Sequence, residues 1–461
     1  MRRLMTGLLN RDKDTICALA SAPGRAGISV VRLSGPQAQV IAKKLCPFLP
    51  ESLESHHIYY GHLRDPKSNH NVDEILAAYF SAGRGFTGEE CFEFSLHGNP
   101  NLVDQCLELL VEHGARMAER GEFTFRAFHH GRIDLVQAES VLDLIQSESR
   151  KSASLSLRQL QGNLSSEMFQ LKSEITSILA HLEANIDFAA EDIQVAEMDV
   201  LRDQTQALVS QIEKLLSNHR AGRILRSGFK VILLGSPNVG KSSLLNVLLG
   251  EEKAIVTPIE GTTRDLIEGQ FLLEGYPVDL MDTAGLRESL DEIEKIGQKR
   301  AREKMESADL ILMLIDGSKG VFPEEQALFE SLPRDKTLVL VHKSDLKPAK
   351  ISGDFGSVPS VRLSSKTGEG LDDLKGMILK RILQEVPSED SVVSVNARHY
   401  NHLKRAQKFL GDSLTLMVNE ESPDLIALEL HQCLRQIYEI LGEVYDDQVM
   451  DQVFSQFCIG K

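Results

Sequence analysis

Three kinds of hydrophobic pattern follow one another along the 461 residues of the chain. From about Thr15 to Arg120, short runs rich in β-branched and aromatic residues alternate with Gly/Pro turns and one apolar helical stretch near 102–111. Runs of this kind, at 28–31, 75–80 and 92–96, are typical of strands. The first part of the chain is therefore predicted to be a small α+β domain.

From about Arg126 to Ser217 the pattern becomes helical, with apolar residues recurring at spacings of three and four. One set predicts the buried face of a single long helix: Leu157, Leu160, Leu164, Met168, Leu171, Ile175, Ile178, Leu182 and Ile186. A second helix follows, and the same period returns after Pro387. The apolar residues with this spacing there are Leu430, Leu434, Ile437 and Leu441.

Between the helical parts, apolar strand-like runs alternate with helical stretches from Gly228 to about Ile382. The runs 231–234, 278–281, 310–315 and 338–341 predict a mainly parallel sheet covered by helices on both faces. We predict four segments: an N-terminal α+β domain (1–125), the first helical part (126–225), an inserted α/β domain (226–383) and the second helical part (384–461). The two helical parts are expected to pack on each other.

Composition narrows the function classes. Hydrophobic residues make up 42% and charged residues 26%, as in an ordinary globular protein. No apolar run reaches the roughly 18–20 residues of a membrane span, and the first residues do not resemble a signal peptide. Six scattered cysteines favour reduced thiols, which together with these features predicts a cytoplasmic protein. The net charge of −16 argues against a surface built for non-specific nucleic-acid binding.

Residues 235–242, GSPNVGKS, match G-x4-G-K-S, directly after one predicted strand and before a helical stretch. That context is the one a phosphate-binding loop requires, because backbone N–H groups and the helix N-terminus then face the phosphates. Lys241 is predicted to bridge the β- and γ-phosphates, and the Ser242 hydroxyl to bind Mg²⁺.

Three further elements follow in the order found in GTPases. Thr263, within Gly261–Asp265, can reach Mg²⁺, and Asp282 of DTAG comes straight after a strand and holds Mg²⁺ through water. The third, around Ser364, resembles a loop whose backbone contacts guanine O6. The predicted nucleotide-binding residues are Asn238, Val239, Gly240, Lys241, Ser242, Ser243, Thr257, Thr262, Thr263, Asp282, Thr283, Ala284, Gly285, His342, Lys343, Asp345, Ser364, Ser365 and Lys366.

Base choice depends on His342-Lys343-Ser344-Asp345 after a strand-like run. Asp345 can accept two hydrogen bonds from guanine that adenine cannot offer, so GTP is favoured over ATP. The usual motif begins with Asn rather than His342. A histidine N–H could donate to guanine N7, but the usual tie from Asn to the phosphate loop is in question.

Hydrolysis needs a substitute for the usual glutamine, because Leu286 follows the DTAG and cannot hydrogen-bond a water. The acidic stretch Glu288, Asp291, Glu292 and Glu294 supplies local acceptors or is a solvated helix start. A monovalent cation held beside the phosphates, with Asn238 as a ligand, could stabilise the transition-state charge.

Taken together, these residues resemble the tRNA-modification GTPase family MnmE (TrmE) over about 14–461. The motifs that carry the resemblance are short and spread along the chain. They are Pro23-Gly24-Arg25, Val31-Arg32-Leu33-Ser34-Gly35, Phe86-Thr87-Gly88-Glu89, Gly121-Glu122-Phe123, Asp134-Leu135-Val136-Gln137-Ala138-Glu139, Leu160-Gln161-Gly162, the GTPase set and the terminal Phe457-Cys458-Ile459-Gly460-Lys461.

The resemblance implies a potassium-activated GTPase that works with a flavoprotein partner, MnmG (GidA), which carries FAD. In the family the pair installs an aminomethyl-type group on C5 of the wobble uridine of certain tRNAs. The one-carbon unit comes from 5-formyl- or methylene-tetrahydrofolate. The N-terminal domain would bind the folate and form a homodimer, and the partner would complete a heterotetramer.

Site residues carried over by position fall into four groups. The K⁺ ligands would be Asn238, Thr257, Ile259 and Thr262, and Mg²⁺ would be held by Ser242 and Thr263. Glu294 would orient the attacking water. The folate site would be Arg32, Glu93, Arg132 and Lys461, and Cys458 would lie near the modification chemistry or be a free thiol on the tail.

Two other readings stay open on the sequence alone. A ribosome-assembly GTPase of the Era or Der kind shares the GTPase signals, but the chain has no GxxG-type RNA-clamping loop in a basic setting. A non-catalytic, nucleotide-dependent scaffold is the other. If the favoured function holds, the acidic chain leaves much of the RNA-binding surface to its partner, and cations around Arg398, His399, Lys404 and Arg405 assist or form a solvated helix face.

Overall fold

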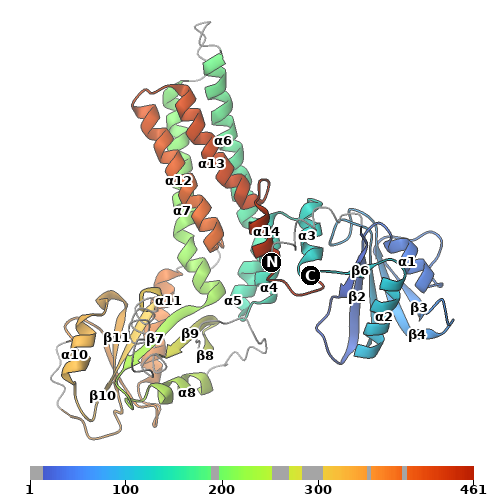
Figure 1. Ribbon diagram of the computed structural model, residues 1–461. Helices are drawn as coiled ribbons and strands as arrows, with labels where there is room; N and C mark the ends of the chain where they lie inside the picture. Colours follow the sequence, from blue (N-terminus) through green and yellow to red (C-terminus); the bar gives the residue numbers. More distant parts are fainter. Residues whose placement is uncertain (1–13, 188–196, 252–268, 283–304, 350–354, 387–391) are drawn as a thin grey trace, which may run out of the picture. The chain divides into compact units, whose positions relative to one another are not determined.

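The computed structural model describes residues 14–187, 197–251, 269–282, 305–349, 355–386 and 392–461 (Figure 1). The chain divides into two compact units. The first comprises Met1–Leu142, Gln159–Ser210 and Asn401–Lys461, and the second Asp143–Arg158 and Gln211–Tyr400. The four predicted segment boundaries stay predictions, because this division groups the N-terminal residues with part of the helices.

The first unit begins with a mixed sheet whose strand order is β3-β4-β5-β2-β1-β6. Adjacent strands are antiparallel except β1 and β6, which are parallel. The predicted strands and the predicted helix are confirmed. The elements are β1 (Ile16–Leu19), β2 (Ala26–Ser34), α1 (Ala38–Leu45), β3 (His57–Arg64), β4 (Asn71–Phe80), β5 (Cys91–Gly98), α2 (Pro100–Glu112) and β6 (Arg116–Met117).

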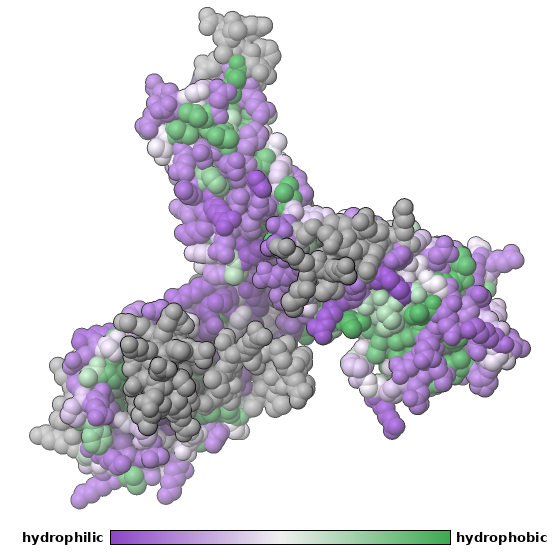
Figure 2. Space-filling view, in the orientation of Figure 1, coloured by the Kyte–Doolittle hydropathy of each residue, from purple (hydrophilic) through white to green (hydrophobic). Residues whose placement is uncertain are grey.

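The two faces of this sheet differ because side chains alternate along each strand. One face joins α1 and α2 in a core that includes Val31, Ile75 and Phe94. On the other face, Tyr60 is paired with Leu76, and both are exposed, as are Ile58 and Ile28. Figure 2 shows apolar residues on the surface of this part of the chain.

Helices make up the rest of the first unit and extend into the second. They are α3 (Glu122–His129), α4 (Leu135–Ile145), α5 (Arg150–Leu160), α6 (Asn163–Asp187), α7 (Met198–Ser227), α12 (Ala397–Val418), α13 (Pro423–Leu441) and α14 (Asp447–Phe454). The prediction that the two helical parts pack on each other is confirmed, because α13 lies against α6.

The single long helix predicted across 157–186 is wrong. α5 ends at Leu160 and α6 begins at Asn163, with Gly162 between them at φ +97°. That backbone conformation is outside the helical region, and glycine adopts it at little cost. Periodicity alone missed the break because Leu160 and Leu164 keep helical spacing across it.

The second unit contains a sheet of order β12-β11-β10-β7-β9-β8, parallel except for the β8–β9 pair. All four predicted strands are present, and the predicted parallel sheet is confirmed. The elements are β7 (Phe229–Gly235), α8 (Lys241–Glu251), β8 (Gly269–Leu273), β9 (Tyr276–Asp282), β10 (Leu310–Asp316), α10 (Pro323–Glu330), the 3-10 helix η3 (Arg334–Lys336), β11 (Thr337–His342), β12 (Ser360–Leu363) and α11 (Leu371–Glu385). Separate clusters of buried side chains lie on its two faces.

Two other predictions concern the cysteines and membrane spans. The six cysteines form no disulfide, and all but Cys458 are buried. Within the described ranges, no helix is both long enough and apolar enough to cross a bilayer.

Asp279, in the middle of β9, predicts a pH effect on stability. Its side chain is buried, its Oδ1 has no hydrogen-bond partner among the described residues, and burial raises its pKa to about 6. The folded chain then binds an extra proton between about pH 4 and pH 6, so this carboxylate destabilises the fold above that window. We expect Asp279→Asn to stabilise the chain on the order of 2 kcal/mol at pH 8 and to have no effect at pH 4.

Scanning calorimetry of both proteins at the two pH values measures the difference directly. Equal shifts of the melting temperature at pH 4 and pH 8 would show that the charge of Asp279 is not the cause.

Candidate functional site: a nucleotide loop and an open sheet face

The predicted phosphate loop lies between β7 and α8, at the carboxyl end of the sheet. Its backbone takes two left-handed turns, at Asn238 (φ +61°) and Gly240 (φ +110°). Such turns point successive N–H groups into one concavity, which favours an anion. Lys241 begins α8, and its Nζ donates to the carbonyl oxygens of Gly235 (3.0 Å) and Ser236 (3.1 Å).

The loop that would read the base is likewise held by hydrogen bonds. The Ser364 hydroxyl donates to Asp345 Oδ1 at 2.7 Å, and this hydrogen bond lowers the pKa of Asp345. The carboxylate is therefore kept ionised and able to accept hydrogen bonds. Lys343 donates to the Asn238 carbonyl (2.9 Å) and to Asp316 Oδ2 (2.7 Å), which ties this segment to the phosphate loop.

His342 supplies the tie that the missing asparagine left in question. Its Nδ1 donates to the Val239 carbonyl at 2.8 Å, and its Nε2 lies 2.7 Å from Ser365 Oγ. Both ring nitrogens are therefore engaged within the protein. The predicted donation from His342 to guanine N7 is not supported by this geometry, because no ring N–H is left for the base.

The structure thus brings one set of predicted nucleotide residues together: 238–243, His342, Lys343, Asp345 and 364–366. Ser242 and Ser243 are exposed in the first turn of α8. Asp282 ends β9, and only this position in the strand is described. The other predicted residues lie outside the described residues. They are Thr257, Ile259, Thr262, Thr263, Thr283, Ala284, Gly285 and Glu294.

Two supporting residues were missed from the sequence. Glu325, near the start of α10, accepts a 2.6 Å hydrogen bond from Ser236 Oγ in the phosphate loop. Asp316 ends β10 and pairs with Lys343. For Asp316 a signal existed, since an acid directly after an apolar strand lies at the carboxyl edge of a parallel sheet.

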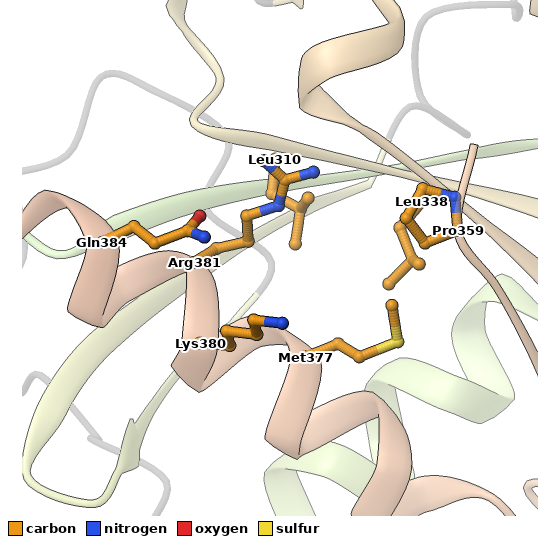
Figure 3. Close-up of a pocket in the computed structure, with 7 residues that line it drawn as sticks. All are labelled: Leu310, Leu338, Pro359, Met377, Lys380, Arg381 and Gln384. Carbon is orange, nitrogen blue, oxygen red and sulfur yellow. The ribbon is translucent and has the colours of Figure 1, made fainter. Parts of the chain in front are cut away.

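A cavity of about 260 Å³ in the same unit is separate from these loops. Leu310 and Leu338 line it at the amino ends of β10 and β11, and Pro359 lines it directly before β12. Met377 and Arg381 of α11 line it from one side (Figure 3). The nucleotide loops follow the carboxyl ends of the same strands. The cavity is therefore at the opposite edge of the sheet and is not part of the nucleotide site.

The predicted folate residues lie in the first unit, and three of them meet on the exposed face of its sheet. Arg32 of β2 and Glu93 of β5 are register partners and form a salt bridge at 2.7 Å. Lys461 interacts electrostatically with both, and burial, followed by repulsion from Arg32, lowers its pKa. The chain end reaches them because Ile459 pairs with Arg120.

The surroundings of Arg32 are consistent with a ligand. Its guanidinium lies over the rings of Phe86 (5.2 Å) and Phe123 (5.4 Å), and its Nη1 is buried without a hydrogen-bond partner among the described residues. A buried donor left unpaired is costly, so an acceptor that reaches it would be favoured. Arg132 is exposed and forms no salt bridge with the described part of the chain. Cys458 is exposed.

In the second unit, the sheet order β12-β11-β10-β7-β9-β8, with a G-x4-G-K-S loop and the Asp345 loop at its carboxyl edge, defines a P-loop GTP hydrolase. Two family models match the chain. One is described as "GTP-binding protein TrmE N-terminus" and matches 15–132, and the other as "MnmE helical domain" and matches 135–458. The chain belongs to the MnmE (TrmE) family.

Individual relatives agree over nearly their full length. The tRNA modification GTPase MnmE of Bdellovibrio bacteriovorus is 43% identical, with 98% of each chain covered. That of Syntrophotalea carbinolica is 41% identical (97% of this chain, 99% of that one), and that of Staphylococcus aureus strain JH9 is 38% identical (98% and 100%).

Proposed function

We propose that this GTPase acts in tRNA modification, at C5 of the wobble uridine, together with an MnmG-type flavoprotein. The observation that carries the proposal is kinship over nearly the whole chain with proteins named tRNA modification GTPase MnmE, combined with a phosphate loop that turns through Asn238 and Gly240. The shared length matters because it includes the N-terminal sheet and the helices, which a ribosome-assembly GTPase of the Era or Der kind does not need.

GTP would be held by the loops described above, with its base on Asp345 and its phosphates at Lys241. The donor chemistry suits Mg²⁺, since a serine hydroxyl at the start of α8 is a hard oxygen ligand. Ser242 would hold the ion with Thr263. Bound Mg²⁺ would neutralise charge on the β- and γ-phosphates.

K⁺ would be held by Asn238, Thr257, Ile259 and Thr262, and Glu294 would orient the water in place of a glutamine. Asn238 supports this assignment. Its side chain is exposed at a left-handed turn, while its carbonyl is occupied by Lys343. The amide oxygen is therefore available to a ligand beside the phosphates.

A reduced folate would be bound on the open sheet face by Arg32, Glu93, Lys461 and Arg132. A carboxylate suits the amino and ring N–H groups of a pterin, and cations suit the glutamate tail. The fit is supported by the unpaired Nη1 of Arg32 and by the aromatic rings beside it. The exposed Cys458 thiol, three residues before the chain end, would lie near the transferred carbon.

The same face supports the proposed homodimer. Ile28, Ile58 and Tyr60 are each more than half exposed on it. Exposed apolar patches of this kind mark protein interfaces. Because the chain carries a net charge of −16, the flavoprotein would supply much of the tRNA surface. His399 is fully buried and cannot belong to a surface cation cluster, which leaves Arg398, Lys404 and Arg405.

The decisive experiment is reconstitution with the flavoprotein, FAD, tRNA, reduced folate and GTP in K⁺, with the modified nucleoside detected by mass spectrometry. We expect product only in the complete mixture. Replacing K⁺ by Na⁺ is expected to slow GTP hydrolysis about tenfold or more, because the cation would stabilise charge in the transition state. Glu294→Ala is expected to stop hydrolysis while mant-GDP still binds.

The Glu93→Gln variant tests the folate site separately. It keeps the size of the side chain and removes its charge, so folate binding should weaken while GTP hydrolysis is unchanged. Turnover of GTP without any modified nucleoside in the complete mixture would contradict the proposed role in tRNA modification.

A further inference from the structure

His342 connects two loops that approach the nucleotide from different elements. It ends β11, and the residue is 3% exposed. On one side its ring meets the phosphate loop, where a Cβ on Gly240 would lie 2.3 Å from both Cε1 and Nδ1. On the other side it meets Ser365, which follows β12.

The position of the ring proton follows from the partners. The Val239 carbonyl can only accept, so Nδ1 must carry the proton. A neutral ring then has a lone pair on Nε2, which accepts from the Ser365 hydroxyl and lies 3.4 Å from the Ser365 backbone N. Burial lowers the pKa of His342, which favours this neutral ring.

The far side of the connection belongs to the loop that reads the base. Two adjacent serines hold it: Ser364 bonds Asp345, and Ser365 bonds His342. The Lys366 N–H also donates to Ser364 Oγ at 3.2 Å. Through His342, therefore, the loop expected at the base and the loop expected at the phosphates share one buried side chain.

We propose that His342 is a positioning residue that fastens the phosphate loop to the 364–366 loop and thereby slows release of the bound guanine nucleotide. The proposal rests on the proposed nucleotide site. Asparagine, the usual residue at this place in the motif, is too short to make both bonds. Its amide reaches about as far as Nδ1 of histidine but not as far as Nε2, so it can serve the phosphate loop and cannot reach Ser365.

This difference in reach gives matched variants. His342→Asn keeps a donor for Val239 and loses the bond to Ser365, whereas His342→Gln reaches towards Ser365 and loses the bond to Val239. Ser365→Ala removes the hydroxyl alone. Ser360→Ala, at an exposed serine at the start of β12, is the control.

Stopped-flow fluorescence with mant-GDP gives association and dissociation rates for the full-length variants. Since one hydrogen bond is lost in each, we expect dissociation about fivefold faster in His342→Asn and in Ser365→Ala, with association and Ser360→Ala unchanged. Adding Ser365→Ala to His342→Asn should have no further effect, because the bond is already lost. Adding it to His342→Gln should accelerate dissociation again.

Two results would overturn the proposal. One is that mant-GDP dissociates from Ser365→Ala at the wild-type rate. The other is that Ser365→Ala still accelerates dissociation about fivefold in the His342→Asn background. Failure of the proposed nucleotide site would look different, because the wild-type chain would then bind no mant-GDP.

Discussion

Gly240→Ala is expected to weaken nucleotide binding about 100-fold or more, while the rest of the chain stays folded. Two costs add. Residue 240 has φ +110°, a conformation that costs an alanine about 1–3 kcal/mol. The new Cβ would also lie 2.3 Å from the His342 ring, which is held by bonds on both sides and cannot move away without breaking them.

Titration with mant-GDP measures the loss, and a thermal melt checks the fold. Gly250→Ala is the matched control, because Gly250 lies in α8 and nothing approaches its Cβ position within 4 Å. In a helix this change stabilises the fold by up to about 1 kcal/mol. Because the new methyl group touches nothing, nucleotide binding should be unaffected. Wild-type affinity in Gly240→Ala would mean that the loop binds nucleotide in a conformation different from the one described here.

Arg126→Met is expected to destabilise the N-terminal part by about 3–5 kcal/mol, since it leaves the buried Glu89 without its cation and Glu122 with Arg116 alone. The Arg126 side chain is 2% exposed and bonds Glu89 (2.9 Å) and Glu122 (3.0 Å). It also donates to the Asp14 carbonyl at 2.8 Å. Methionine fills a similar volume, so the loss measures the charge and its hydrogen bonds rather than a cavity.

The effect should depend on pH. Burial raises the pKa of Glu122, whereas its hydrogen bonds with Arg116 and the Glu119 backbone and the charge of Arg126 lower it, with the lowering prevailing. Without Arg126, part of this lowering is lost. A depressed carboxylate pKa stabilises the fold above the unfolded pKa of about 4.3 and loses that contribution as pH falls below it. The deficit of Arg126→Met should therefore be largest at neutral pH.

The chain has no tryptophan and more than one unit, so hydrogen exchange by mass spectrometry is the suitable measurement. Peptides from β2 and β5 should lose about 100-fold or more of their protection. Lys67→Ala is the control, because Lys67 and Glu112 form an exposed pair (71% and 48%), and exposed pairs contribute little to stability. Equal protection in both variants would show that the buried cluster does not stabilise the sheet.

Much of the fold could be predicted because local patterns determine it. The apolar run 310–315 has the length of a buried strand and forms one, and the phosphate loop carries its own signal in two glycines, a lysine and a serine. Sequence similarity to relatives along nearly the whole chain then placed the chain in a family. The predicted long helix was wrong because one positive-φ residue, Gly162, leaves hydrophobic spacing intact while it breaks the helix.

Contacts between residues far apart in the chain were decided only by the tertiary structure. The sequence showed that His342 replaces an asparagine, but which atoms its two ring nitrogens meet depends on how β11, the phosphate loop and the 364–366 loop pack. Likewise Arg32, Glu93 and Lys461 come from two strands and the chain end, and no spacing along the sequence brings them together. Hydrophobic periodicity reports what each segment buries locally, whereas such sites depend on sheet register and on where the end of the chain docks.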